Sequence, residues 1–389
     1  MEGLGIRIRG SFASAVAAIV LAATPALGAT THYIAFGDSI TAGVGDSSDR
    51  AQPGYPPRLQ ELLQAQGDDA VIENDGVGGE KTPQGLTRID GVLANGGDVM
   101  LLMEGTNDIS VGISEETTLF NLGQMAQRAA DKGIETVQAT LIPRKPLAPV
   151  DPNNILNAKI AEDIRQLAYS NGRHLVDPYQ VFSTTPNVFS QDYIEVADDP
   201  VGHPNAHGYD LLAQTFADVL LGDDSVPPVP GPLTPENASE GVSSATPVTV
   251  VLFDFGTGID ASTVSMSVDG SLVSPTISGD AHRMQLDYHP AAPLSGLVTI
   301  AVHAADMSAP ANVRDGEVSR FFVAGSSALT GDVNLDGRVD GQDLVLFALH
   351  FGASRHQMRY RSDLDFNSDG VIDGSDLAIL AANFGQKTP

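Results

Sequence analysis

Several residues able to perform nucleophilic chemistry follow apolar, strand-like runs in the first half of the chain. The clearest case is Ser39, which comes directly after the apolar run 32–36 and within the triplet Gly37-Asp38-Ser39. A serine is a poor nucleophile unless a base takes its proton and hydrogen-bond donors stabilise the oxyanion that forms. Gly, Asp and Ser are also ordinary turn and helix-capping residues. The remaining sequence must therefore supply a histidine, an acid and donors if Ser39 is to be a nucleophile.

The chain supplies such residues in order. Gly78 and Gly79 lie in "NDGVGGEKT", Asn107 lies in "GTND", and His203 lies in "DDPVGHPNAHGYD". Adjacent glycines allow backbone amides to approach a substrate closely. The complete set favours a nucleophilic role for Ser39 over a simple capping role.

Alternating strand and helix patterns surround these residues and predict an α/β unit over 29–222. Five strand-like runs are expected at 32–37, 70–75, 98–105, 135–143 and 173–179. Helical spacing is expected at 56–67, 83–96, 118–133, 153–172 and 205–222. Such alternation predicts a parallel sheet covered on both faces, with the ligand site at the carboxyl ends of the strands. Ser39 and Asn107 would both lie at that edge.

The four blocks, taken in this order, resemble the SGNH (GDSL) hydrolase family over about residues 31–222. The resemblance implies a flavodoxin-like three-layer α/β/α fold and a carboxylic ester hydrolase. It also implies that Ser39 is the nucleophile and His203 the general base. The oxyanion would then be bound by the backbone N–H groups of Ser39 and Gly79 and by the side-chain amide of Asn107.

The acid of the expected triad departs from the family pattern D-x-x-H. Pro200 stands three residues before His203, whereas Asp199 stands four before it and Asp198 five before it. One extra loop residue would bring Asp199 to the imidazole. Asp199 is therefore our first choice as third member of the triad, with Asp198 as the alternative.

The C-terminal region contains an internal repeat. Residues 332–352 return as residues 365–385, and both copies carry D-x-N-x-D-G-x-x-D-x-x-D. Oxygen ligands at loop positions 1, 3, 5, 7, 9 and 12, with Gly at position 6, suit calcium. The predicted ligands, with the backbone carbonyl serving at position 7, are Asp332, Asn334, Asp336, Arg338, Asp340 and Asp343, then Asp365, Asn367, Asp369, Val371, Asp373 and Asp376.

The paired loops resemble a type I dockerin over roughly 331–386. This resemblance implies two structural calcium sites, a small helical module and a cohesin-type protein partner. Positions 10 and 11, which contribute to cohesin choice in that family, are Gly341-Gln342 and Gly374-Ser375 rather than the common Ser/Thr pairs. A calcium-stabilised end module without a partner is the alternative. Calcium is expected to serve this module alone, with no cofactor in the catalysis.

Composition divides the rest of the chain. Residues 1–28 have the basic start, apolar run and small-residue ending of a secretory signal peptide, with cleavage near Gly28-Ala29. Residues 223–241 are rich in Pro, Gly and acids and predict a linker. Short alternating runs over 242–326 predict an all-β sandwich, and "GIDASTVSMSVDG" resembles bacterial immunoglobulin-like modules. Residues 327–389 complete the chain as the dockerin-like module.

Net charge and cysteine content exclude several classes of function. The formal charge of −28 repels nucleic acid and anionic lipid, and the absence of cysteine excludes disulfides and thiolate chemistry. We therefore expect a secreted or cell-surface serine esterase that does not span a membrane. The β-sandwich and dockerin-like tail favour a carbohydrate O-deacetylase acting on an acylated polysaccharide. The alternatives are a lipolytic enzyme (lysophospholipase, arylesterase or thioesterase) and a non-catalytic surface binding protein.

Overall fold

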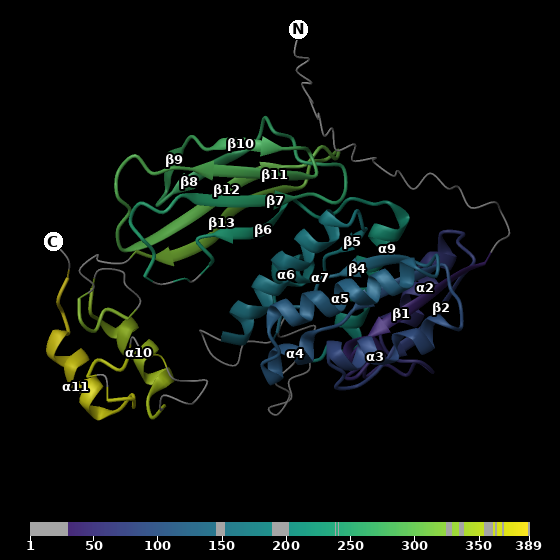
Figure 1. Cartoon of the computed structure of the whole chain (residues 1–389), viewed down its shortest axis with the longest axis horizontal. Helices are drawn as coiled ribbons and strands as arrows, with labels where there is room; N and C mark the ends of the chain where they lie inside the picture. Colours follow the sequence, from purple (N-terminus) through teal and green to yellow (C-terminus); the bar gives the residue numbers. More distant parts are fainter. Residues whose placement is uncertain are drawn as a thin grey trace, which may run out of the picture.

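The computed structural model describes most of the chain after residue 29 (Figure 1). The described residues are 30–144, 152–188, 202–237, 239, 241–323, 329–333, 338–353, 361, 364–367 and 369–387. The predicted signal peptide, residues 1–28, lies outside them.

A five-stranded parallel sheet forms the centre of the N-terminal unit. Its strands are β1 (Thr31–Gly37), β2 (Ala70–Gly76), β3 (Val99–Met103), β4 (Glu135–Ala139) and β5 (Leu175–Val176). Their spatial order is β2-β1-β3-β4-β5, and every neighbouring pair is parallel. This order is the flavodoxin-like one, in which the chain reverses direction across the sheet beside β1. The prediction of a parallel α/β sheet is confirmed.

Helices cover both faces of this sheet. They are α1 (Ser39–Ala42), α2 (Tyr55–Ala65), α3 (Thr82–Leu93), α4 (Thr106–Val111), α5 (Glu115–Ala130), α6 (Pro152–Ser170), α7 (Pro178–Thr184) and α9 (Ala206–Leu221). Alternate residues of β1 enter two separate cores: Tyr33 packs with α2 and α9, and Ile34 packs with α3, α5 and α6. Because side chains alternate across a strand, this is the three-layer arrangement that the sequence predicted.

Two antiparallel four-stranded sheets follow and pack face to face (Figure 1). Their orders are β10-β11-β7-β6 and β13-β12-β8-β9. The strands are β6 (Val229–Thr234), β7 (Val248–Phe253), β8 (Ser265–Val268), β9 (Ser271–Val273), β10 (Thr276–Gly279), β11 (Arg283–Tyr288), β12 (Leu297–Ala305) and β13 (Val313–Phe322). The predicted all-β sandwich is confirmed.

The segment expected to be a linker, 223–241, contains strand β6. It pairs with β7 at the edge of its sheet, where Pro230 and Pro232 are tolerated because an edge strand needs fewer N–H donors. The segment also bonds to the N-terminal unit: the guanidinium of Arg165 donates to the Pro230 carbonyl at 2.7 Å. The Pro- and Gly-rich composition therefore marks a packed joint between the two units rather than a free spacer.

The C-terminal region forms a small module from its two repeats. Helices α10 (Gly341–His350) and α11 (Gly374–Asn383) occupy equivalent positions. The backbone of Ile372 joins the two halves, since its carbonyl accepts from Gly352 N–H and its N–H donates to the Ala353 carbonyl. Val339, Phe347, Ile372 and Leu380 share one core. Among the described residues, no helix in any unit has the length and hydrophobicity that crossing a membrane requires.

Candidate active site and calcium loops

The triplet Gly37-Asp38-Ser39 forms the turn from β1 into α1. A Cβ at Gly37 would overlap the Met103 carbonyl oxygen and the Thr41 side chain, so only glycine permits this close packing. The Asp38 carboxylate caps α1 by accepting the N–H of Ile40 at 2.9 Å. Because Asp38 performs the capping, the hydroxyl of Ser39 remains available for chemistry at the carboxyl end of the strand.

Ser39 and His203 meet although they lie far apart in the sequence. The Nε2 atom of His203 lies 2.8 Å from the Ser39 Oγ, which is hydrogen-bonding distance. His203 lies on the loop before α9, and Asn205 caps that helix by accepting the N–H of Gly208 at 3.0 Å. The structure thus brings together the two residues that the sequence predicted as nucleophile and base.

Backbone and side-chain donors surround the same point. Among the described residues, no acceptor forms a hydrogen bond with the N–H groups of Ser39 or Gly79. Gly79 has φ +74°, a conformation that glycine adopts readily, and its loop is bonded to β1 through Val77 N–H and the Gly37 carbonyl at 3.0 Å. The Asn107 amide donates to the Glu80 carbonyl at 2.8 Å. The same nitrogen also lies 3.5 Å from the Asp38 carboxylate, a long and weak bond that an oxyanion could replace.

An ion pair fixes the loop that contains Gly79. The Arg88 guanidinium donates to both carboxylate oxygens of Glu80 at 2.6–2.9 Å and to the Asp75 carbonyl at 2.7 Å. The guanidinium also lies 3.9 Å from the ring centroid of Phe36, on the strand that leads to Ser39. Since the Glu80 carbonyl binds Asn107, this pair positions two of the predicted oxyanion donors.

Two buried acids lie close to the nucleophile. Burial raises the pKa of Asp38 to about 6, although the Ile40 N–H and the charge of His203 act in the opposite direction. Burial, together with the charges of Asp38 and Glu80, raises the pKa of Glu104 well above its usual range. Neither carboxyl oxygen of Glu104 has a hydrogen-bond partner among the described residues.

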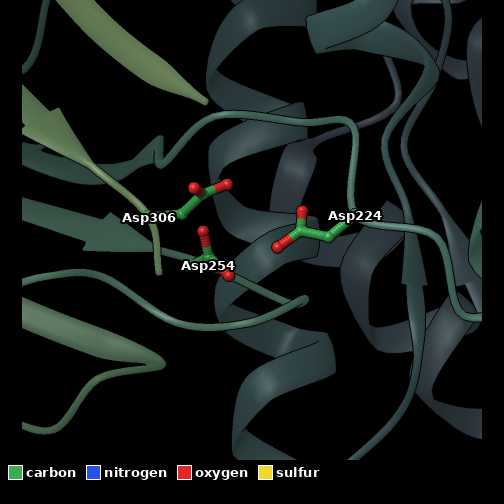
Figure 2. Close-up of side chains that lie close together, drawn as sticks. All are labelled: Asp224, Asp254 and Asp306. Atoms are coloured by element: carbon green, nitrogen blue, oxygen red, sulfur yellow. The ribbon is translucent and has the colours of Figure 1, made fainter. Parts of the chain in front are cut away.

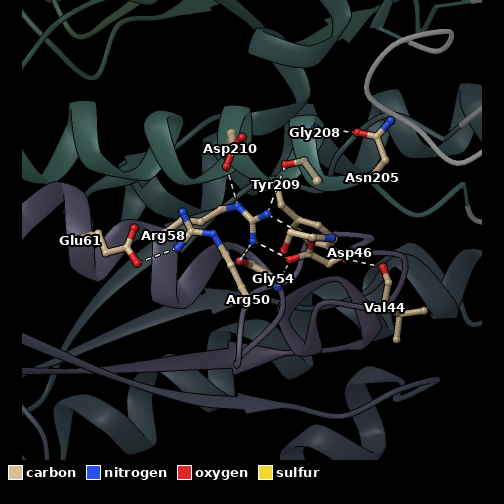
Figure 3. Close-up of polar contacts among 12 residues, drawn as sticks. Val44, Asp46, Arg50, Gly54, Arg58, Glu61, Asn205, Gly208, Tyr209 and Asp210 are labelled. Carbon is tan, nitrogen blue, oxygen red and sulfur yellow. Dashed lines mark hydrogen bonds and ion pairs between the residues drawn. The ribbon is translucent and has the colours of Figure 1, made fainter.

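A second ion-pair network connects the loop after Ser39 to the helix after His203 (Figure 3). Arg58 on α2 bonds Asp46 at 2.5 Å and Asp210 on α9 at 2.6 Å. The Tyr209 hydroxyl donates to the Val44 carbonyl at 2.7 Å. Burial alone would raise the pKa of Asp46, but the bonds from Arg58 and Gly54 outweigh it and lower that pKa below its usual range. This network positions the nucleophile turn and the His203 loop relative to each other.

The acids near the ends of the later strands and loops remain to be placed. Asp199, Asp198 and Pro200 lie outside the described residues, so the third member of the triad stays a prediction. Asp177, at the end of β5, caps α7 and forms a buried ion pair with Arg165 at 2.7 Å.

The C-terminal loops provide an oxygen-only set of candidate ligands. Asp343 accepts the N–H groups of Val333 and Asp340, and Asp376 accepts those of Asn367 and Asp373. Asp343 and Asp376 are both fully buried. Burying carboxylates is costly unless they are paired or coordinate a cation, so these loops fit calcium. The remaining predicted ligands within the described residues are Asp332, Arg338, Asp340, Asp365, Asn367, Asp369, Val371 and Asp373, whereas Asn334 and Asp336 lie outside them.

Comparison with known protein families gives two matches. Residues 35–211 match the model of the GDSL-like Lipase/Acylhydrolase family. The chain carries a GDSL-like hydrolase domain. Residues 330–385 match the Dockerin type I domain, which implies structural calcium binding. The predicted resemblances to these two families are therefore confirmed, and the first domain is that of a carboxylic ester hydrolase.

Solved structures similar to the GDSL-like domain include three bacterial proteins. One is a member of the lipolytic protein G-D-S-L family from Veillonella parvula. It is 22% identical in sequence, the match covers 50% of the present chain and 99% of the Veillonella chain, and the TM-score is 0.41. The lipase/acylhydrolase from Enterococcus faecalis has 21% identity, coverages of 48% and 93%, and a TM-score of 0.40. A catalytic mutant of an acetylxylan esterase from Geobacillus stearothermophilus has 20% identity, coverages of 48% and 92%, and a TM-score of 0.40. No curated protein matches the sequence.

Sequence reasoning missed the residues that support the GDSL-like site. The pairs Arg88–Glu80 and Arg58–Asp46 join a helix to a loop, and neither has the i,i+3 or i,i+4 spacing that marks neighbours on one helix. The one available signal was the presence of basic residues on otherwise amphipathic helices. That signal does not identify their partners.

Proposed function

We propose that this chain is a secreted serine esterase in which Ser39 attacks the ester carbonyl and His203 is the general base. The observation that carries the proposal is the 2.8 Å contact between Ser39 Oγ and His203 Nε2, beside the N–H groups of Ser39 and Gly79, which have no acceptor in the described part of the chain. The oxyanion would be bound by the N–H groups of Ser39 and Gly79 and by the Asn107 amide. These donors are positioned before substrate arrives, as electrostatic stabilisation requires.

The reaction proceeds in two acyl-transfer steps. Ser39 Oγ forms a bond to the carbonyl carbon while His203 Nε2 takes the hydroxyl proton. The tetrahedral intermediate then breaks its bond to the alcohol oxygen, and His203 returns the proton to that leaving alcohol. Water attacks the acyl-enzyme with His203 again as base. The carboxylic acid leaves and the Ser39 hydroxyl is restored.

Asp199 is our proposal for the residue that orients the His203 imidazole, with Asp198 as the alternative. An acid bonded to Nδ1 fixes the tautomer in which Nε2 can accept a proton. Replacing each in turn by Asn separates them. The orienting residue should lower kcat by several orders of magnitude, while the other should leave it nearly unchanged.

The substrate class we favour is an acetylated polysaccharide. The dockerin type I domain supports this, because it would bind the enzyme to a cohesin-type protein at an extracellular site where polysaccharide is processed. Calcium would serve that domain and take no part in the ester chemistry. Rates on acetyl esters and on long-chain esters would distinguish a deacetylase from a lipolytic enzyme, since a deacetylase should lose activity as the acyl chain lengthens.

The first experiment measures hydrolysis of p-nitrophenyl acetate by the chain without residues 1–28. Ser39→Ala should abolish turnover. Ser170→Ala is the matched control, since its hydroxyl accepts from Gln166 at the C-terminal end of α6. A calcium chelator should leave the rate nearly unchanged. A folded Ser39→Ala protein with wild-type turnover would overturn the proposal.

A further inference from the structure

Three carboxylates from distant parts of the chain meet where the GDSL-like domain joins the β-sandwich. Asp224 follows α9, Asp254 follows β7, and Asp306 follows β12. One oxygen of each lies within 4.8 Å of the corresponding oxygens of the other two, and Figure 2 shows the carboxylates turned toward one another. Within the described part of the chain, no other group of three or more Asp, Glu, His or Cys residues meets this condition.

Asp254 supplies a buried oxygen without a partner. The residue is 3% exposed, and its Oδ1 accepts the N–H groups of Gly256 at 3.0 Å and Gly258 at 2.8 Å. Its Oδ2 is buried and forms no hydrogen bond among the described residues. A buried carboxylate oxygen is costly to leave unpaired, so this atom indicates a missing ligand.

Neutral donors orient the other two carboxylates. Asp224 Oδ2 accepts both the N–H and the hydroxyl of Thr257 at 2.7 Å. A Cβ at Gly256 would overlap the Asp224 carboxylate, so the glycine makes room for it. Asp306 is also 3% exposed and accepts from the Ser308 hydroxyl at 2.6 Å and from the Asn312 backbone and side chain at 2.8 and 2.7 Å. The geometry of the cluster is therefore built into the loops.

Burial, neutral hydrogen-bond donors and neighbouring acids are the main influences on the pKa of Asp254 and of Asp306. Burial, followed by the charges of Asp224 and Asp306, raises the pKa of Asp254 to about 6. At neutral pH like charges repel at this separation, more strongly than in water because the site is partly dry. A bound cation would convert this repulsion into attraction.

We propose that Asp224, Asp254 and Asp306 bind a calcium ion at the junction between the two units. Three carboxylates suit a hard divalent cation, and calcium accepts waters and carbonyls to complete six to eight ligands. A cavity of about 480 Å³, lined in part by Asp224 and Asp254, gives the ion and its waters access. Since Asp224 belongs to the segment that leaves α9, the ion would fasten the hydrolase domain to the sandwich. This site is separate from the dockerin loops.

Calcium binding to the full chain tests the proposal by equilibrium dialysis with radioactive calcium. Asp254→Asn and Asp306→Asn should each bind one ion fewer per chain than the wild type. Asn can still accept the N–H groups of Gly256 and Gly258, so Asp254→Asn should fold. Asp315→Asn, an exposed acid on β13 of the same sandwich, is the matched control and should bind as many ions as the wild type. Equal stoichiometry in all four proteins would overturn the proposal.

Thermal unfolding separates a cation site from a structural cluster. With a chelator present, Asp254→Asn should unfold at a higher temperature than the wild type, because one like charge is removed. With calcium present, the wild type should gain more in Tm than the variant. If the carboxylates act only as hydrogen-bond acceptors, the variant will be no more stable than the wild type with chelator, and both proteins will gain equally from calcium.

Discussion

Replacing Asn107 by Ala should reduce turnover without unfolding the protein. The Asn107 amide is one of three donors that we assign to the oxyanion, and removal of one such donor typically raises the barrier by about 3 kcal/mol. Since each 1.4 kcal/mol is a factor of ten, kcat should fall on the order of 100-fold. KM should change little, because this interaction forms fully only in the transition state.

The structural cost of this substitution is smaller. The side chain loses its 2.8 Å bond to the Glu80 carbonyl, worth about 1 kcal/mol, and a weaker 3.5 Å bond to the Asp38 carboxylate. A typical domain is stable by roughly 5–15 kcal/mol, so the variant should remain folded at 25 °C. A loss of 100-fold in kcat therefore cannot come from unfolding.

Asn171→Ala is the matched control for Asn107→Ala. Its amide also donates to a backbone carbonyl, that of Leu167 at 2.7 Å. Asn171, however, lies between α6 and the start of β5, at the amino ends of the strands and away from the site. Urea unfolding should show a comparably small loss of stability, while p-nitrophenyl acetate hydrolysis should match the wild type. If Asn107→Ala keeps kcat within about threefold of wild type, Asn107 does not belong to the oxyanion site.

Three further variants test the supporting residues. Arg88→Met keeps an apolar side chain against Phe36 but leaves Glu80 without its ion-pair partner. Because placement of the oxyanion donors contributes to the barrier, kcat should fall about tenfold with KM nearly constant. An unchanged kcat would show that this ion pair does not support the site. Arg58→Ala leaves Asp46 buried without its ion-pair partner and should lower the free energy of unfolding by about 3–5 kcal/mol in urea titrations. Glu104 has a raised pKa when folded, so the folded state binds more protons and wild-type stability should decline as pH rises above the ordinary value of 4.5. Glu104→Gln should remove that part of the decline between pH 5 and pH 8, and parallel curves would contradict it.

The sequence predicted the sheet and the reacting residues because both leave local signals. Buried parallel strands are continuous apolar runs, and β1 is one of them, with Ile34 and Phe36 in one core and Tyr33 and Ala35 in the other. The last residue of the strand, Gly37, is a glycine because the packing of Met103 and Thr41 leaves no room for a Cβ. The short motif Gly37-Asp38-Ser39 therefore indicates both a position that requires glycine and the position of the nucleophile.

The joint between the units could not be predicted in the same way. The Pro and Gly residues of 223–241 predicted a linker because both residue types are disfavoured in interior strands. An edge strand, however, accepts them. Arg165 binds the carbonyl of Pro230 across this joint, and Asp224, Asp254 and Asp306 meet beside it. These partners are far apart in the sequence, so no periodicity or spacing relates them.

Asp38 combines a structural and an electrostatic role beside the nucleophile. Its carboxylate caps α1, which fixes Ser39, and it lies 3.5 Å from the Asn107 amide nitrogen, where its charge competes with a developing oxyanion. The attraction between Asp38 and His203 acts in the other direction, since it favours the positive imidazole formed when His203 takes the serine proton. The negative charge thus weakens one part of the transition state and stabilises another. Replacing the acid by a neutral cap such as Asn would keep the bond to Ile40 and remove both electrostatic effects.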